Sequence, residues 1–284
     1  MLIKKAVASV MAVATFAAVF TACDKDRTKE PSDTNGPDTS VQSEEGQGDP
    51  AAAKKFIVGF DQDFPPMGFV NENNEYVGFD LDLAKEAAKR MGKEFVAQPI
   101  AWDSKDQELK SGNISCIWNG ITITEERKDA YEWSDPYMKN QQVVVVKNDS
   151  SVKSLADLAG LKVCVQKDSS GLAALEGKPE LTATFSELVQ VDSYLNALME
   201  LESGSVDAIV MDEIVARYEI QTSGKPFVVI DEAVSAEEYG VGFLKGNKEL
   251  RDKVQKTLEE MAKDGTMAKI SEKWFGADIT TIGK

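Results

Sequence analysis

The stretch Ile117-Trp118-Asn119-Gly120-Ile121-Thr122-Ile123-Thr124-Glu125-Glu126-Arg127 indicates the fold class most directly. The residues just before it, from Ile114 onward, are apolar and mostly β-branched, which predicts a short buried strand. From Thr124 the pattern predicts the start of a helix, with Thr122 and Glu125 at the spacing of a capping box. A buried strand that leads through a short turn into a helix is typical of an α/β protein.

The turn between this strand and the expected helix could bind an anion. Its small and polar residues leave backbone N–H groups without an intrahelical partner. A carboxylate placed there would meet those donors, the positive end of the helix dipole and the guanidinium of Arg127. The same residues also fit an ordinary turn with a solvated arginine, which is the commoner case, so the rest of the chain must decide.

Composition indicates a globular protein and excludes some partners. The 284 residues are enough for one large domain or two ordinary ones, and they are 42% hydrophobic and 28% charged. A formal net charge of −16 argues against a nucleic-acid or anionic-membrane surface as the partner. We therefore expect no binding to nucleic acid.

The sequence lacks histidine and has few cysteines, two residue types on which many catalytic and metal sites depend. There is no histidine, which excludes histidine-dependent nucleophile pairs and histidine metal sites. The cysteines Cys23, Cys116 and Cys164 are too few and too scattered for a zinc cage or a disulfide framework. We expect no metal and no cofactor, and we expect Cys116 and Cys164 to be buried thiols that do not pair.

The N-terminal region predicts export and attachment to a membrane. Residues 1–22 combine a basic start with a short apolar core, as a signal peptide does. The end of this segment, with Cys23, resembles the lipobox of bacterial lipoproteins, which implies acylation (palmitate) at Cys23; a plain secretory signal is the alternative. Residues 23–54 are too polar to bury a core, so we expect a disordered linker that carries the lipid anchor.

In the first half of the body, candidate ligand contacts follow the ends of strands. The strand around Ile57 is followed by Asp61 and Phe64, on a loop that two prolines hold stiff. Trp102 comes just after the next strand. Open α/β sheets bind ligands beyond the carboxyl ends of their strands, although a tryptophan there is more often part of the core.

The second half of the body repeats this pattern. Ser169 and Ser170 precede an apolar run at another strand-to-helix turn, and Asp212 ends a buried strand. Each could simply cap a helix. The apolar run at 142–147 predicts a strand that passes from one lobe into the other, and residues 239–244 predict a strand that returns.

Several segments, in the same order along the chain, resemble the polar amino-acid-binding receptors of ABC importers. The similarity covers about residues 56–276. The segments that carry it are Tyr76-Val77-Gly78-Phe79-Asp80-Leu81-Asp82-Leu83-Ala84, Gly120-Ile121-Thr122-Ile123-Thr124-Glu125-Glu126-Arg127-Lys128, Trp133-Ser134-Asp135-Pro136-Tyr137, Leu155-Ala156-Asp157-Leu158-Ala159-Gly160, Val206-Asp207-Ala208-Ile209, Tyr239-Gly240-Val241-Gly242-Phe243, Gly265-Thr266 and Lys273-Trp274-Phe275-Gly276.

The resemblance implies an α/β, two-lobed fold like that of the periplasmic binding proteins (a Venus flytrap), with two hinge strands. Lobe 1 would comprise residues 55–145 and 241–284, and lobe 2 would comprise residues 146–240. The lobes would close like a hinge on a ligand.

The resemblance also assigns roles at the ligand site. The ligand carboxylate would contact Arg127, Thr122 and the backbone of Gly120. Its ammonium would contact Asp212, with further hydrogen bonds from Ser169 and Ser170. Side-chain specificity would then depend on Asp61, Phe64, Trp102 and Asn119. Aromatic rings beside a carboxylate suit a cation, so lysine or arginine is the first expectation and glutamine is close behind.

The expected function is an extracytoplasmic receptor, attached to the membrane through its lipid anchor, that delivers a free amino acid to an ABC importer permease. We expect a monomer and no enzymatic activity. The alternative is a cyclohexadienyl or arogenate dehydratase-like enzyme on the same scaffold, for which Glu213 and Asp103 would be candidate acids. A sensor that reports to a kinase would need a signalling domain, and the sequence has none.

Overall fold

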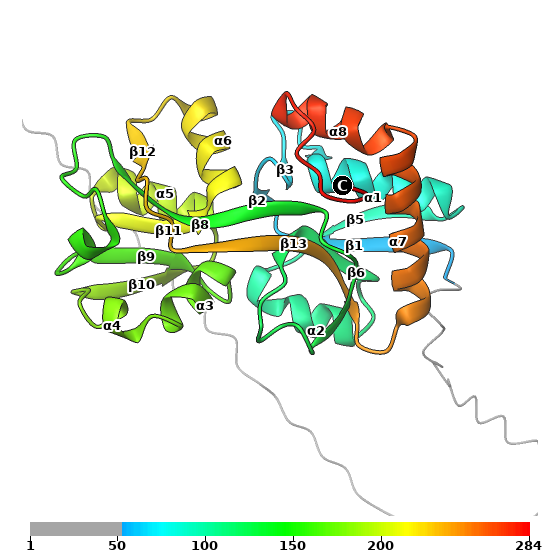
Figure 1. Ribbon diagram of the computed structural model, residues 1–284, viewed down its shortest axis with the longest axis horizontal. Helices are drawn as coiled ribbons and strands as arrows, with labels where there is room; N and C mark the ends of the chain where they lie inside the picture. The colour runs from blue at the N-terminus through cyan, green and yellow to red at the C-terminus, as the bar shows by residue number, and fades with distance from the viewer. Residues whose placement is uncertain (1–52) are drawn as a thin grey trace, which may run out of the picture. The chain divides into compact units, whose positions relative to one another are not determined.

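The computed structural model describes residues 53–284, so the expected signal peptide, most of the linker and the lipidation site Cys23 lie outside the described residues. Within this range two α/β halves are joined by two long strands (Figure 1). No helix among these residues is both long and apolar enough to cross a membrane.

A single mixed sheet runs through both halves, and helices cover it. Its ten strands are β1 (Lys55–Phe60), β5 (Glu94–Pro99), β6 (Cys116–Thr122), β7 (Tyr131–Trp133), β8 (Met138–Lys147), β9 (Lys162–Gln166), β10 (Glu187–Val191), β11 (Ala208–Asp212), β12 (Phe227–Val229) and β13 (Ser235–Leu244). A small second sheet consists of β2 (Asp63–Phe64), β3 (Gly68–Val70) and β4 (Tyr76–Val77). The helices are α1 (Phe79–Arg90), α2 (Lys105–Lys110), α3 (Ser170–Glu176), α4 (Pro179–Thr182), α5 (Tyr194–Ser203), α6 (Glu213–Ser223), α7 (Lys248–Lys263) and α8 (Thr266–Phe275), with 3-10 turns η1 (Trp102–Ser104) and η2 (Leu155–Leu158).

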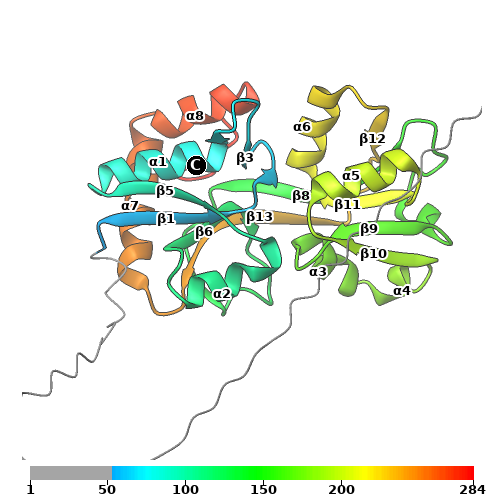
Figure 2. The same ribbon diagram turned by 180° about the vertical axis from the view of Figure 1, so that it is seen from behind.

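The strand order explains how the halves are joined. The main path through the sheet is β10-β9-β11-β8-β13-β6-β1-β5, so β8 and β13 lie side by side at its middle. Figures 1 and 2 show β8 and β13 running from one half into the other. The first half holds β1, β5 and β6 with α1, α2, α7 and α8, and the second holds β9 to β12 with α3 to α6.

The two-lobed fold with two hinge strands, expected from the sequence, is confirmed. The apolar run that predicted one crossing is the buried part of β8, and the predicted return lies within β13. The lobe boundaries at 145/146 and 240/241 stay a prediction, because both strands contribute to both halves. The apolar stripe of α7, which comprises Leu250, Val254, Leu258 and Met261, is fully buried.

One local prediction was wrong. No helix follows Thr124, because β6 continues to Thr122 and residues 125–130 form turns. The strand is extended by antiparallel pairing with β13, in which Thr122 lies opposite Tyr239. Tertiary pairing therefore overrides the local helix-start signal.

The start of α1 buries the acidic side chain of Asp80. Gly78 occupies the cap position, and Asp80 is buried in the first turn of the helix.

Cys116 and Cys164 are buried and unpaired thiols, as predicted.

Candidate functional site

The ten residues expected to bind ligand come from both halves. All except Arg127, which is half-buried, are buried. Asp61 follows β1, Phe64 ends β2, and Trp102 begins η1. In the second half, Ser169 caps α3 by accepting a hydrogen bond from the Leu172 N–H at 3.1 Å.

Several of these residues make contacts with the opposite half. The Gln166 side-chain amide donates to Asp61 Oδ2 at 2.7 Å, and Thr122 Oγ1 donates to Ser170 Oγ at 3.1 Å. The Phe64 ring stacks on Tyr194, with ring centroids 5.6 Å apart and planes 28° from parallel. The structure therefore represents a closed arrangement of the halves.

Asp61 is a buried carboxylate that the surrounding backbone holds in place. Its Oδ1 accepts a hydrogen bond from the Asp63 N–H at 2.9 Å. Burial raises the pKa of Asp61 to about 6, although the bonds from Asp63 and Gln166 favour the charged form. A carboxylate that is costly to ionise when buried is suited to pair with a cation.

Asn119 positions the Asp61 loop. Its Oδ1 accepts a hydrogen bond from the Asp61 N–H at 3.0 Å, and its buried Nδ2 has no hydrogen-bond partner. That nitrogen lies close to Gly68 of the first half. The expectation that Asn119 contacts the ligand side chain therefore stays a prediction, and its observed contact is structural.

Gly120 also contacts its own half. Its backbone is left-handed, with φ of 56°, and a Cβ at this position would lie 2.9 Å from the Phe64 ring. Its N–H donates to the Asp80 carboxylate at 2.6 Å. The backbone donor that the sequence assigned to a ligand carboxylate is thus already paired in this structure.

Arg127 reaches across to the opposite half. Its Nη2 donates to the backbone carbonyl of Asp168 at 2.6 Å. The Lys105 ammonium also pairs with the Asp168 carboxylate, and it lies 5.0 Å from the centroid of the Trp102 ring. Burial and the neighbouring guanidinium of Arg127 lower the pKa of Lys105.

Asp212 lies in a buried polar network between the hinge strands and the second half. Its Oδ2 accepts a hydrogen bond from the Tyr194 hydroxyl at 2.7 Å, and its Oδ1 accepts from Asn140 Nδ2 at 2.8 Å and from the Tyr239 hydroxyl. It does not cap α6 through its side chain. None of these donors is charged, so the Asp212 carboxylate has no cationic partner within this network.

Glu237 of β13 belongs to the same network and was missed from the sequence. Its Oε1 accepts from Asn140 Nδ2 at 2.6 Å and from Gln142 Nε2 at 3.0 Å. Burial and the nearby Asp212 raise the pKa of Glu237 to about 8. A possible signal was the alternation of Asn140 and Gln142 along a hinge strand, which places two amides on one face.

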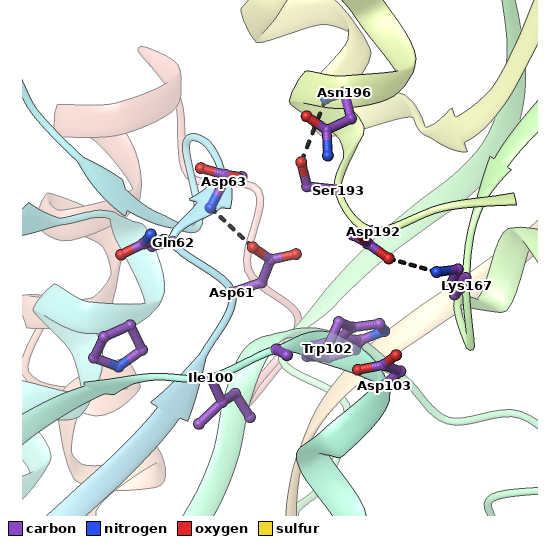
Figure 3. Close-up of a pocket in the computed structure, with 12 residues that line it drawn as sticks. Asp61, Gln62, Asp63, Ile100, Trp102, Asp103, Lys167, Asp192, Ser193 and Asn196 are labelled. Carbon is purple, nitrogen blue, oxygen red and sulfur yellow. Dashed lines mark hydrogen bonds and ion pairs between the residues drawn. The ribbon is translucent and has the colours of Figure 1, made fainter. Parts of the chain in front are cut away.

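A cavity of about 640 Å³ adjoins the contact between the halves. Figure 3 shows Asp61 and Trp102 on one side of it, facing Asp192 and Lys167 on the other. Lys167 pairs with Asp192 at 2.6 Å. Because Asp63 and Asp103 also line the cavity, its carboxylates outnumber its single ammonium group.

The described residues 53–284 contain no group of three or more His, Cys, Asp or Glu side chains arranged to hold a metal ion. The expectation that the protein uses neither metal nor cofactor stays a prediction.

Comparison with known proteins identifies the relatives of this chain. Residues 56–277 match the model of the bacterial extracellular solute-binding proteins, family 3. The L-cystine-binding protein TcyJ of Escherichia coli K12 is 34% identical over 229 residues, which cover 79% of this chain and 84% of that protein.

Solved structures agree with this match. A histidine-bound substrate-binding protein of an ABC uptake transporter from Streptococcus pneumoniae has a TM-score of 0.79 and 35% identity, covering 82% of this chain and 99% of that one. An ancestral arginine-binding protein bound to arginine has a TM-score of 0.74 and 43% identity, with coverage of 79% and 99%. These proteins are substrate-binding proteins rather than enzymes.

Proposed function

The chain belongs to the bacterial extracellular solute-binding proteins of family 3, and we propose that its halves close on a free amino acid and deliver it to an ABC importer permease. The observation that carries this proposal is the set of contacts between the halves. Asp61 accepts from Gln166, Thr122 donates to Ser170, and Arg127 donates to Asp168. Hinge closure would bring these same groups around a ligand.

The charges at the contact suit a zwitterion. Arg127 offers a guanidinium from the first half, and Asp212 offers a carboxylate from the end of β11. A buried ligand charge must be paired, because an unpaired ion costs several kcal/mol. Arg127 would bind the ligand carboxylate, assisted by Thr122, and Asp212 would bind its ammonium.

We propose a cationic amino acid, arginine or lysine, as the preferred ligand. Among residues 53–284, the Asp61 carboxylate accepts hydrogen bonds from the neutral donors of Asp63 and Gln166 and forms no ion pair, and the adjoining cavity carries an excess of carboxylates. Phe64 and Trp102 would flank the ligand side chain. The relatives named above bind L-cystine, histidine or arginine, so cystine, histidine and glutamine are the competitors to test. Nothing in the comparisons favours the dehydratase alternative.

The test is calorimetric titration of the purified protein with each common amino acid and with L-cystine. Arginine or lysine is expected to bind more tightly than glutamine, histidine and cystine. If a neutral amino acid binds best, the ligand assignment is wrong. If none of these compounds binds, the proposed function fails.

Replacing Arg127 tests the carboxylate contact. Arg127→Ala is expected to weaken binding of the preferred ligand more than tenfold, or about 1.4 kcal/mol, because a buried ligand carboxylate would lose its charged partner. Lys128→Ala is the matched control, since Lys128 is exposed and its ion pair in the described part of the chain is with the neighbouring Glu125 at 3.3 Å. If Arg127→Ala binds the ligand within tenfold of the parent, Arg127 does not contact the ligand carboxylate.

We also propose that the protein is anchored to the membrane by acylation of Cys23, which lies outside the described residues. Mass spectrometry of the mature N-terminus is expected to find a lipid-modified cysteine, and Cys23→Ser is expected to release the protein from the membrane fraction. An unmodified N-terminus elsewhere would indicate an ordinary secretory signal.

A further inference from the structure

Lys105 is a charged side chain buried at the contact between the halves. Only 1% of its surface is exposed, although it belongs to α2 of the first half. Its ammonium pairs with the Asp168 carboxylate and lies 3.4 Å from the carbonyl oxygens of Trp102 and Asp168. Because an unpaired buried ammonium is costly, Lys105 depends on a residue of the other half.

Asp168 has a backbone conformation that serves this contact. It lies between β9 and α3 with φ of 52°, a left-handed value that is uncommon outside glycine. The turn presents both its carboxylate and its carbonyl oxygen to the first half, where the carbonyl also accepts from Arg127 at 2.6 Å. A single strained residue thus meets two cations of the opposite half.

We propose that Lys105 and Asp168 form an interlobe latch that holds the halves closed whichever amino acid lies between them. Opening the hinge would remove both Asp168 acceptors from Lys105, so the ion pair exists only in the closed form. A contact present only in that form slows opening and therefore slows ligand release. The Trp102 ring beneath the Lys105 ammonium would be held in place by the same contact. This inference rests on the hinge closure proposed above.

The latch predicts a change in dissociation without a change in ligand preference. In stopped-flow measurements on the full chain, Lys105→Met and Asp168→Asn are each expected to release arginine and lysine about tenfold faster. The effect is moderate because the Asp168 side chain is 52% exposed and partly screened. The ratio of the two affinities should stay unchanged, and the double variant should release ligand no faster than either single variant.

Lys162→Met is the matched control, because Lys162 pairs with Glu187 at 3.3 Å within the second half. Its release rates should match those of the parent. Asp168→Asn keeps a residue type that tolerates the left-handed backbone, so it tests the charge even if Lys105→Met fails to fold. Unchanged release in Asp168→Asn, or faster release of one amino acid only, would overturn the latch.

A second measurement does not depend on a bound amino acid. The latch should favour the closed form even without ligand, so that a fraction of the ligand-free parent is closed. Small-angle scattering of ligand-free protein is therefore expected to give a larger radius of gyration for Asp168→Asn than for the parent and for Lys162→Met. An equal radius for all three would overturn the latch. If none of the amino acids binds, the proposed function fails, while this comparison still decides whether the latch exists.

Discussion

At the scale of single residues, Asp61 is the group on which ligand preference is proposed to depend. It is 6% exposed, yet its hydrogen-bond partners in the described structure are the neutral donors of Asp63 and Gln166. Burial therefore raises its pKa to about 6. A cationic ligand side chain would supply the charge that the protein itself does not.

Asp61 should make ligand binding depend on pH. Arginine needs the ionised carboxylate, so its affinity is expected to weaken below pH 6 by up to about tenfold per pH unit. In Asp61→Asn the affinity should be lower at pH 7 and nearly independent of pH between 5 and 7. Calorimetric titration across this range measures both, with glutamine as the neutral comparison. An unchanged pH profile in Asp61→Asn would contradict the assignment.

Asp61 should also affect stability, and the sign follows from its raised pKa. The unfolded chain ionises near the ordinary value of 3.8, whereas the folded protein ionises at about 6. The folded state therefore binds more protons in this window, and the free energy of unfolding falls as pH rises from about 4 to about 6. Asp61→Asn should remove this fall, which amounts to about 3 kcal/mol. Denaturant unfolding at pH 4 and pH 7 tests it, and an equal pH dependence in both proteins would contradict it.

At the scale of elements, the sequence predicted what depends on local patterns. The apolar run from Val143 to Val146 was found in β8 as expected, and Ser169 caps α3, which was the alternative to a ligand contact there. The helix after Thr124 was not, because pairing with β13 decides the conformation there. Local patterns do not reveal such long-range pairing.

A buried network around Asp80 links α1, β6 and Tyr137, the residue just before β8. The Asp80 carboxylate accepts from the Gly120 N–H at 2.6 Å and from the Tyr137 hydroxyl at 2.8 Å. Burial raises the pKa of Asp80 to about 7. The strand that carries the proposed ligand contacts is therefore tied to a helix and to the start of a hinge strand.

Removing one donor from this network should destabilise the fold. Tyr137→Phe leaves the buried carboxylate with one donor fewer, so the free energy of unfolding is expected to fall by about 2 kcal/mol at pH 8. The loss should be smaller at pH 5, where Asp80 is protonated and needs the donor less. Denaturant unfolding measures both, and Tyr76→Phe is the control because Tyr76 is 45% exposed. An equal loss at both pH values would contradict the role of Asp80.

At the scale of the whole molecule, the closed arrangement depends on contacts that no sequence pattern indicated. Gln166, Lys105 and Asp168 all act through partners in the opposite half that are remote in the chain. Which side chains meet across the halves depends on how the hinge closes. The sequence could place most of the proposed ligand contacts at strand ends and turns, but it could not show that Gly120 and Asn119 already have partners within their own half.

Closure of the two halves on an amino acid can be measured as the distance between them with and without that amino acid. Spin labels at Lys110→Cys in α2 and Glu180→Cys in α4, both exposed and on different halves, report this distance in a Cys23→Ser background. Saturating arginine is expected to shorten the mean distance and narrow its distribution. A distribution that stays unchanged while calorimetry records binding would contradict closure of the two halves on the ligand.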